Sequence, residues 1–541
     1  MGTESAAPAW RSVLVLMIGG SVQALCFAPG PLPAWILPFA QIAALAMLAF
    51  YVFSADSARQ AAWRGLVFGI AQFAVGVYWL TISMHEYGGL ALPLAIAALL
   101  LFSAAMALYP ALAAAACRAL CPPHDAAAGS AWRYIMAAAL WASCWTLGEW
   151  LRGTLFTGFP WLNIGYAHVE GMFAAWAPFV GVYGLAWLAA FASGAIALMA
   201  RAKDTGNDAR AATAVGLALV TGLLGIGWTH IVWVSAHGQP ILLRLVQTNT
   251  PQSMKFDPAR FEHALGDAMH LAGLPPKAED GIPQLIILPE TVIPVLQDRV
   301  QETVWQQWQA ISARMNADIL MGVPLHRVVN GTDRYTNSAI ALNAHSRPSD
   351  LMLGRPAWHY DKHHLVPFGE FVPPGFRWFV DAMHIPLGDF DRGAVRQPPL
   401  HVATQYLAVD ICYENAFGEE IVQAVRPGPD NEAGASILVN ISNLAWFGDS
   451  WALRQHLQIA RMRALETARP VVTATNTGIT AAIDSQGRIT ATLSPAVRGV
   501  LDVEIQGTEG LTPYVRWGNL PILSFVGLCL LGGLWRRRRI S

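Results

Sequence analysis

The chain has 541 residues, of which 54% are hydrophobic and 13% are charged, with a formal net charge of −1 at pH 7. Soluble domains carry about 25% charged residues, so this composition excludes an ordinary soluble protein and indicates a membrane protein. The balanced charge, without a basic domain, gives no reason to expect nucleic acid as a partner. Six cysteines without regular spacing exclude a disulfide scaffold and a zinc ribbon.

Apolar residues are distributed unevenly along the chain. From Arg11 to about Val234 apolar runs dominate, and a last apolar run follows Trp517. A membrane-spanning helix needs about 20 mostly apolar residues, and about eight segments satisfy this criterion. These candidate spans are residues 12–28, 33–53, 62–83, 89–117, 132–150, 172–200, 211–233 and 518–535. We therefore predict a membrane module that is interrupted by one large soluble domain.

These runs also set the predicted domain boundaries. Residues 1–235 hold all but the last span, residues 236–510 form the soluble domain, and residues 511–541 hold the last span and a basic tail. Glu149 and Arg152, three residues apart at the end of one candidate span, are spaced to pair on one helix face.

Basic residues in the short loops predict the orientation of the chain. They gather in alternate loops and in the tail, at Arg59, Arg64, Arg118, Arg133, Arg201, Lys203, Arg210 and residues 536–539. The opposite loops, residues 28–33 and 84–90, contain no Lys or Arg. The positive-inside rule therefore predicts a multi-pass protein of the bacterial inner membrane, with both termini cytoplasmic and the soluble domain in the periplasm.

Short, nearly continuous apolar runs in the soluble domain are typical of strands that are buried on both faces. They cover residues 241–246, 284–288, 318–322, 338–342, 407–411 and 436–439. Helical patterns lie between several of them, at residues 258–273, 297–316 and 450–468. This alternation predicts α/β layers, and residues 470–475 and 480–487 are expected to form hairpins that close a sheet.

Three residues of complementary chemistry lie near the ends of these strands. Glu290 and Cys412 each follow a predicted strand, and Lys362 lies in a polar segment between them. Cys412 is the only cysteine between about residues 239 and 517, so it has no disulfide partner within the soluble domain. Ligand crevices form at the carboxyl ends of strands in α/β sheets, so we expect the three side chains to converge there.

A thiol, a carboxylate and an ammonium together suit acyl transfer. A thiol attacks a carbonyl carbon as its thiolate, and Glu290 can accept the thiol proton as a general base. The Lys362 ammonium can stabilise the oxyanion of a tetrahedral intermediate. Glu370 and Glu414 can orient that lysine.

Other interpretations of these residues stay open. Taken alone, Cys412 is more often a buried structural thiol than a nucleophile. A Cys–His hydrolase would take its base from His363, His364 or His456. His359 and His363 are spaced like two zinc ligands on a helix, but nearby prolines argue against a helix there and no third ligand is evident. We expect neither a metal nor another cofactor.

Several motifs around these residues resemble one enzyme superfamily. They are Leu288-Pro-Glu290, residues 360–373, Ile411-Cys-Tyr-Glu414, Asn440-Ile-Ser-Asn443 and Ala445-Trp-Phe-Gly-Asp449. These motifs resemble those of the carbon–nitrogen hydrolase (nitrilase) superfamily. With residues 461–466, residues 475–480 and the predicted spans, the whole chain resembles the apolipoprotein N-acyltransferase family.

The resemblance implies a fold and a set of site residues. The expected fold is an α-helical membrane bundle of about eight spans plus a nitrilase-like α/β domain, a four-layer αββα sandwich. The implied catalytic triad is Glu290, Lys362 and Cys412. The matching supporting residues are Asn337, Glu370, Tyr413 and Glu414.

Two positions depart from the usual pattern of the family. Phe256 stands where the family usually has a tryptophan, and Leu444 stands where an aspartate usually follows Asn443. Phe256 and Trp378 are further candidates for substrate contact. Trp378 belongs to the aromatic segment 371–380, which we expect to dip into the membrane and gate acyl-chain entry, although an ordinary packed loop fits it equally well.

The resemblance implies the transfer of an acyl chain between two lipid substrates. The donor is the sn-1 position of a membrane phospholipid, and the acceptor is the α-amino group of the N-terminal S-diacylglyceryl cysteine of an apolipoprotein. We expect the protein to be surrounded by membrane lipids and to be a monomer. The alternative is a membrane-tethered amidase or nitrilase acting on a small carbon–nitrogen substrate. A transporter or receptor would place charged groups inside several spans, and almost none are present.

Overall fold

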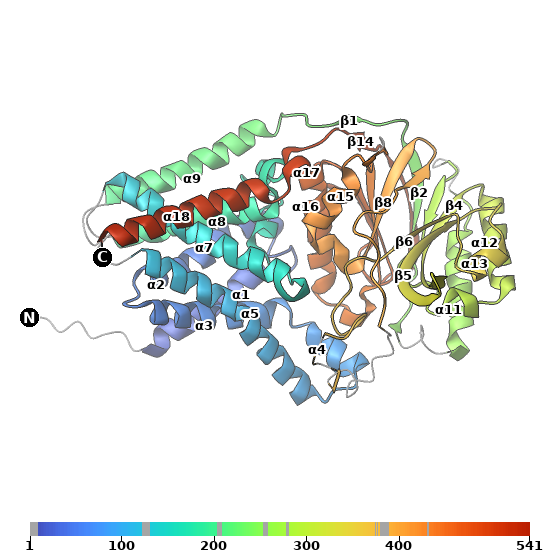
Figure 1. Cartoon of the computed structure of the whole chain (residues 1–541), viewed down its shortest axis with the longest axis horizontal. Coiled ribbons are helices and arrows are strands. Elements are labelled where there is room, and N and C mark those ends of the chain that lie inside the picture. The colour runs from blue at the N-terminus through green and yellow to red at the C-terminus, as the bar shows by residue number, and fades with distance from the viewer. Residues whose placement is uncertain are drawn as a thin grey trace, which may run out of the picture. The chain divides into compact units, whose positions relative to one another are not determined.

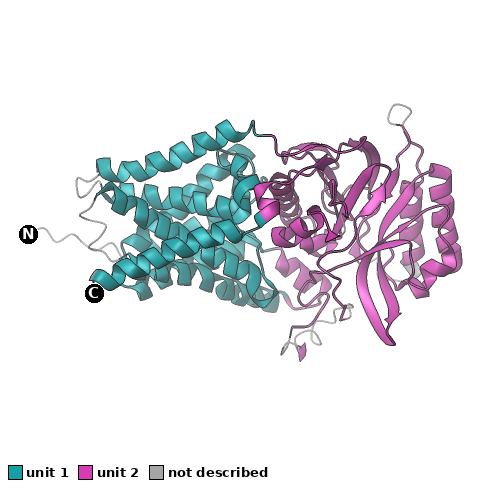
Figure 2. Cartoon of the chain, turned by 45° about the horizontal axis from the view of Figure 1, so that its top comes forward, with its two compact units in different colours: residues 1–78, 92–231, 517–541 teal, residues 79–91, 232–516 magenta. Residues whose placement is uncertain are grey.

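The computed structural model describes residues 9–121, 130–202, 208–252, 258–276, 281–373, 375, 377–378, 389–429 and 432–540. The chain divides into two compact units (Figure 2). The helical unit comprises residues 1–78, 92–231 and 517–541, and the α/β unit comprises residues 79–91 and 232–516. Residues 79–91, which the sequence analysis assigned to the transmembrane part, therefore belong to the α/β unit.

The helical unit has a helix at every predicted span (Figure 1). These helices are α1 (Ala9–Leu25), α2 (Leu37–Phe53), α3 (Ala58–Gly76), α5 (Leu92–Leu120), α7 (Ala131–Thr154), α8 (Ala177–Ala202), α9 (Asp208–Trp228) and α18 (Leu520–Ile540). Among the described residues, five helices are long and apolar enough to cross a membrane, or six if α3 and the bent segment Leu80–Tyr87 form one span. The chain is thus an integral membrane protein, and the count of eight spans stays a prediction.

Small residues bring helices of this unit into close contact. A Cβ atom on Gly20 of α1 would lie 2.1 Å from the carbonyl oxygen of Phe68 in α3. A Cβ atom on Gly65 of α3 would lie 2.6 Å from the carbonyl oxygen of Pro110 in α5. Glycine at both positions therefore lets the backbones of α1, α3 and α5 approach closely, as is common between helices in membranes.

The predicted pair on α7 is confirmed. Arg152 Nη2 lies 3.7 Å from Glu149 Oε1, and both side chains are buried. Glu149 Oε1 also accepts a hydrogen bond of 3.1 Å from the backbone N–H of Ile164. The pair therefore helps to fix the segment that follows α7.

The α/β unit contains two six-stranded sheets. The first has the order β13-β2-β3-β4-β5-β6, with bounds Gly499–Ile505, Ile241–Gln247, Leu285–Ile287, Asp318–Val329, Thr332–Leu342 and Trp358–Asp361. The second has the order β12-β11-β10-β9-β8-β7, with bounds Ile489–Thr492, Ala481–Ile483, Val471–Thr475, Ile437–Ser442, Gln405–Ile411 and Leu400–Val402. Every predicted strand is present, and the antiparallel pair β10–β11 confirms the predicted hairpin region.

The two sheets pack face to face between two layers of helices (Figure 1). Leu243 of β2 and Val409 of β8 belong to one apolar cluster between the sheets. Helices α11 (Pro258–Ala272) and α12 (Glu302–Met315) pack on the outer face of the first sheet, and α15 (Gly418–Val425) and α16 (Ala452–Thr467) pack on the second. Strands buried on both faces explain the continuous apolar runs, and the layers form an αββα sandwich.

Candidate active site

Glu290 lies just beyond β3, at the carboxyl end of a strand that is parallel to both neighbours. Its carboxylate is buried, accepts two hydrogen bonds and forms an ion pair with Lys362. Oε1 accepts from Asn337 Nδ2 at 2.8 Å and lies 3.4 Å from Lys362 Nζ, while Oε2 accepts from the backbone N–H of Asn443 at 2.9 Å. These contacts fix the orientation that a general base needs.

The backbone around Glu290 leaves no room for a side chain on the adjacent strand β4. A Cβ atom on Gly322 would lie 2.6 Å from Glu290 Cα and 2.5 Å from the backbone nitrogen of Thr291. Thr291 itself has a φ of +47°, in the left-handed region. Glycine at 322 therefore lets β4 pass directly beside the turn that presents Glu290.

Lys362 follows β6 and is almost completely buried, with 1% of its surface exposed. Its ammonium donates to Glu370 Oε1 at 2.9 Å and to Glu290 Oε1 at 3.4 Å. Burial lowers the pKa of Lys362, but the charges of Glu370 and Glu290 outweigh burial and raise the pKa above its usual value. The lysine is therefore a fixed positive charge at neutral pH.

Asn337 in β5 joins the two carboxylates that hold the lysine. Its Nδ2 donates to Glu290 Oε1 at 2.8 Å and to Glu370 Oε1 at 2.6 Å. Its carbonyl oxygen accepts the backbone N–H of Lys362 at 2.8 Å. Glu370 uses its second oxygen to accept the N–H of Val366 at 2.8 Å. Asn337 and Glu370 thus both hold Lys362 in place, and their part in catalysis stays a prediction.

Cys412 sits directly after β8, at the first residue of the short helix η8 (Cys412–Ala416). Its φ is +57°, a left-handed conformation that is uncommon for residues other than glycine and that costs about 1–3 kcal/mol. The Cys412 carbonyl oxygen lies 3.2 Å from Asn440 Nδ2 and 3.2 Å from His456 Nε2. These two side chains hold the turn that presents the thiol.

The electrostatic surroundings of Cys412 couple it to the other two residues. Burial raises the pKa of the Cys412 thiol well above its usual range, the charge of Glu290 raises it further, and Lys362 lowers it. The resting side chain is therefore a neutral thiol, unlike the thiolates found beside unopposed cations. Such a thiol needs a base to become a nucleophile, and Glu290 is close enough to act on it electrostatically.

Glu414 fixes backbone rather than the ammonium, which corrects the expectation that it orients Lys362. Its Oε1 accepts from Tyr360 Oη at 2.9 Å and from the N–H groups of His363 and His364 at 2.7 and 3.0 Å. Its Oε2 accepts the N–H of Ile411 at 2.6 Å. Burial raises the pKa of Glu414 to about 7, although Lys362 and these N–H donors lower it. Glu414 ties the segment after Lys362 to the strand before Cys412.

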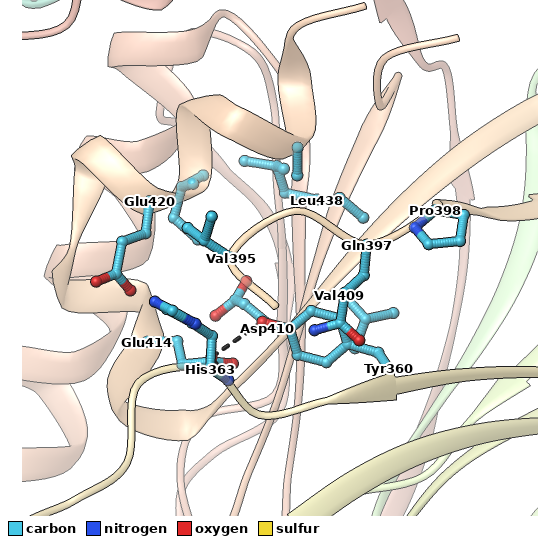
Figure 3. A pocket seen from close by; sticks show the side chains of 13 residues that line it. Tyr360, His363, Val395, Gln397, Pro398, Val409, Asp410, Glu414, Glu420 and Leu438 are labelled. Carbon is cyan, nitrogen blue, oxygen red and sulfur yellow. Dashed lines mark hydrogen bonds between the residues drawn. The ribbon is translucent and has the colours of Figure 1, made fainter. Parts of the chain in front are cut away.

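A pocket in the α/β unit lies beside Glu414 (Figure 3). Its lining includes the acidic side chains of Asp410, Glu414 and Glu420 together with Tyr360 and His363. Within this lining, Glu414 Oε1 accepts hydrogen bonds from Tyr360 Oη and from the backbone N–H of His363. Neither Glu290 nor Cys412 is among its lining residues, so this pocket is distinct from the cluster around the thiol.

Comparisons with known proteins cover the whole chain. The family model for the apolipoprotein N-acyltransferase N-terminal domain matches residues 19–195, and the carbon-nitrogen hydrolase model matches residues 243–514. A relative from Bordetella bronchiseptica, an apolipoprotein N-acyltransferase, is 52% identical across 100% of this chain and 99% of its own length. The chain belongs to the apolipoprotein N-acyltransferase family.

A second relative agrees with this membership. An apolipoprotein N-acyltransferase from Ralstonia nicotianae is 43% identical over 96% of this chain and 92% of its own length. Among solved structures, an amidase from Nesterenkonia sp. AN1 matches 52% of this chain and 98% of its own, at 16% identity and a TM-score of 0.36.

The histidines do not support the alternative of a Cys–His hydrolase. His363 Nδ1 lies 2.8 Å from the carbonyl oxygen of Gly393, and His364 Nδ1 lies 2.9 Å from Glu420 Oε1. Burial lowers the pKa of His456, so its ring is neutral, and its Nε2 donates to the carbonyl of Cys412. Each of the three rings is thus held by a contact other than one to the Cys412 sulfur.

The structure describes only some of the remaining candidates for substrate contact. Phe256 lies outside the described residues, as does most of the segment that was expected to gate entry. Trp378 is described, and 68% of its surface is exposed. Tyr413, the residue after the thiol, packs its ring against His364 and Phe417. The roles of Phe256, Trp378 and Tyr413 in binding substrate stay predictions.

Leu444, one of the two positions that depart from the family pattern, is buried beside Gly478. One of its methyl carbons lies 2.9 Å from where a Cβ atom on Gly478 would be. Asn443 is held by its side chain, which donates to Gln252 Oε1 at 3.2 Å and accepts from Asn476 Nδ2 at 2.8 Å. Amide contacts therefore fix Asn443 without a carboxylate at position 444.

Proposed function

We propose that this chain transfers a fatty acyl chain from the sn-1 ester of a membrane phospholipid to the α-amino group of the S-diacylglyceryl cysteine of an apolipoprotein. Family membership across the full length is the observation that carries this proposal. The clustering of Glu290, Lys362 and Cys412 supports a thioester route, since each supplies one group that two-step acyl transfer requires.

In the first step Glu290 takes the proton of the Cys412 thiol, and the sulfur attacks the carbonyl carbon of the phospholipid ester. The oxyanion of the tetrahedral intermediate is stabilised by the Lys362 ammonium and by the backbone N–H of Tyr413. The intermediate collapses as the glycerol oxygen leaves with the proton held by Glu290. The products are a thioester on Cys412 and a lysophospholipid.

In the second step the neutral α-amino group of the acceptor attacks the thioester carbon. Glu290 accepts a proton from the attacking nitrogen and returns one to the departing sulfur, which restores the Cys412 thiol. An amide is more stable than a thioester, so the transfer runs downhill and the cycle is of the ping-pong kind. Water must be kept from the thioester, which fits the burial of the Glu290 and Lys362 side chains.

The proposed surroundings follow from the substrates and from the basic loops. Both substrates are lipids, so the enzyme acts in the bacterial inner membrane, with both termini in the cytoplasm. The α/β unit then lies in the periplasm, where lipoprotein N-termini are exposed after translocation. We propose that the protein works as a monomer without metal or cofactor.

The test is acyl transfer by the purified full-length protein in detergent. Phospholipid with a radiolabelled sn-1 chain and a synthetic S-diacylglyceryl-cysteine peptide are the two substrates, and the labelled peptide is measured. We expect label on the peptide α-amino nitrogen and an equal amount of lysophospholipid. Release of ammonia from small amides or nitriles, without labelled peptide, would instead favour the tethered amidase.

Exchange of Glu290 for glutamine should change catalysis and thiol reactivity in opposite directions. Glu290→Gln removes the base, so acyl transfer should fall about 10²–10⁴-fold. It also removes a negative charge that raises the pKa of Cys412, so the thiolate forms at lower pH and alkylation becomes faster at a given pH. Alkylation of the Cys412 peptide by iodoacetamide is followed between pH 7 and pH 10 by mass spectrometry.

The conservative variant Asp298→Asn serves as the control for the loss of a carboxylate elsewhere in the α/β unit, where Asp298 contacts His326. It should leave both the transfer rate and the alkylation profile of Cys412 unchanged. If transfer survives Glu290→Gln, or if alkylation of Cys412 becomes slower, Glu290 is not the base.

The exchange of Gly322 for alanine tests the close approach of β4. Gly322→Ala pushes the Glu290 backbone away from Lys362, because the new Cβ atom would lie within 2.6 Å of Glu290 Cα. We expect about tenfold or greater loss of acyl transfer and about 1–3 kcal/mol of destabilisation. Gly266→Ala in α11 is the control, since nothing lies within 4 Å of its Cβ position. Parent activity in Gly322→Ala would contradict this account.

A further inference from the structure

A short segment that covers the end of one predicted span, the following loop and the start of the next span is a structural part of the α/β unit. Trp79–Ala91 connects α3 to α5 in sequence but belongs to the same compact unit as residues 232–516. It contains one helical turn, α4 (Leu80–Ile82), and a turn of π-helix, η2 (Ser83–Tyr87). Its contacts within that unit are specific and lead to the candidate active site.

Trp79 makes the strongest of these contacts. It is buried, with 3% of its surface exposed, and its indole Nε1 donates a hydrogen bond of 2.9 Å to Gln455 Oε1 at the start of α16. Its ring meets the edge of Phe447 with 4.4 Å between ring centroids. Trp79 therefore forms a hydrogen bond with α16 and a ring contact with the short helix η10 (Leu444–Phe447).

Other residues of the segment contact the same short helix η10 and the residue after it. The ring of Tyr87 meets the edge of Trp446 with 5.7 Å between centroids. Ile82 lies against Gly448, where an added Cβ atom would be 3.4 Å from Ile82 Cγ2. The segment thus packs along η10, which begins immediately after Asn443.

Both elements that Trp79 contacts carry groups that touch the proposed catalytic residues. Asn443, the residue that caps η10, donates its backbone N–H to Glu290 Oε2 at 2.9 Å, and the same N–H lowers the pKa of the Cys412 thiol. His456, next to Gln455 on α16, donates from Nε2 to the carbonyl oxygen of Cys412 at 3.2 Å. The turn that presents the thiol is therefore held from two sides.

We propose that Trp79 is a positioning residue for acyl transfer. It holds η10 and the start of α16 in place. Asn443 and His456, which lie on or beside these elements, then keep Glu290 and Cys412 at the correct position relative to each other. This inference rests on the proposed function. It means that the catalytic centre is completed by a segment from between two membrane helices, about 150 residues or more away in sequence from the hydrolase domain that the family model matches.

The test uses Trp79→Phe and Trp79→Leu in the full-length protein in detergent. Single-turnover formation of the acyl-enzyme from phospholipid should slow about tenfold in Trp79→Leu, because a displacement near 1 Å at a reacting group can cost up to about 10²-fold. Trp79→Phe keeps the ring contact with Phe447 but loses the indole donor, so its loss should be smaller. The phospholipid concentration for half-maximal rate should not change.

A second readout distinguishes positioning from a merely structural role. The N–H of Asn443 lowers the pKa of Cys412, so displacement of η10 should move the alkylation profile of Cys412 to higher pH. The pH at half-maximal alkylation is measured in both variants and in the parent. Gln455→Leu should produce part of the effect, and combining it with Trp79→Phe should add less than the two separate losses because the two residues share one hydrogen bond.

Trp305→Phe is the matched control. Trp305 in α12 is also a buried tryptophan of the α/β unit, but it belongs to the core beneath the first sheet. It should lower the melting temperature while the acyl-enzyme rate per folded molecule and the alkylation profile stay at parent values. If the Trp79 variants lower only the melting temperature, the inference is overturned. If the parent itself forms no acyl-enzyme, the proposed function fails instead.

Discussion

Cys412→Ala should abolish acyl transfer, with a loss of at least about 10³-fold in the rate of labelled peptide formation. Removal of the sulfur removes the atom that carries the acyl chain, and no other group at the site can form the thioester. The left-handed turn at Cys412 accommodates alanine, so the fold should persist. The measurement is transfer from radiolabelled phospholipid to the S-diacylglyceryl-cysteine peptide, with the melting temperature recorded alongside.

Cys529→Ala is the control for this exchange. Cys529 lies in α18 and, like Cys412, is a cysteine outside any disulfide. Its replacement should leave the transfer rate at the parent value. Full transfer by Cys412→Ala would mean that the acyl chain passes directly from donor to acceptor, and the thioester route would have to be abandoned.

Lys362→Met should reduce both catalysis and stability. The ammonium is buried between Glu290 and Glu370, and breaking such a buried pair costs about 3–5 kcal/mol because an uncompensated charge is left behind. Loss of the oxyanion partner should reduce transfer about 10²–10³-fold or more. Thermal unfolding in detergent and the transfer assay measure the two effects separately.

The loss of stability in Lys362→Met should depend on pH. Without the ammonium, Glu290 and Glu370 face each other across Asn337 as two buried carboxylates of like charge. Carboxylates repel each other only when both are ionised, and ordinary carboxyl groups ionise above about pH 4. The melting temperature of the variant should therefore fall relative to the parent as pH increases above about 4.

A double variant separates the two roles of the lysine. Adding Glu370→Gln to Lys362→Met removes one of the facing charges, so most of the lost stability should return. Transfer should stay as low as in Lys362→Met, because the oxyanion partner is still absent. Recovery of both stability and transfer would show that Lys362 only neutralises its neighbours.

The strands, and the close contact of Glu290 with Lys362, could be predicted from the sequence for a physical reason. Strands buried on both faces need apolar residues at every position, so they stand out as short apolar runs. Polar residues just beyond such runs lie at the carboxyl ends of parallel strands, which brings Glu290 beside Gly322 of β4 and Cys412 close to the end of β9.

Other features depend on contacts that no local pattern encodes. The pairing of β13 with β2 joins residues more than 250 positions apart, and the conformation of Cys412 follows from donors on β9 and α16. Glu414 was expected to touch the ammonium, because a carboxylate near a lysine suggests an ion pair. Its oxygens instead satisfy backbone N–H groups, whose direction only the folded chain sets.

The place of Trp79–Ala91 in the α/β unit could also not be predicted from the sequence. The segment covers the end of the predicted span 62–83, the loop 84–90 and the start of the predicted span 89–117, so its sequence indicates a part of the membrane module. Only the contacts of Trp79 and Tyr87 with η10 and α16 reveal its place. The number of membrane spans is likewise not fixed by the sequence. Helix α1 has only 17 residues, and α7 contains the charged residues Glu149 and Arg152. Length and apolarity alone therefore do not decide whether these two helices cross the membrane.

The most direct measurement is the mass of the protein after incubation with phospholipid and no acceptor, followed by peptide mapping. The thioester account predicts one added acyl chain, located on the peptide that contains Cys412, sensitive to hydroxylamine and lost when the S-diacylglyceryl-cysteine peptide is supplied. An unmodified Cys412 peptide in protein that still acylates the acceptor would contradict it.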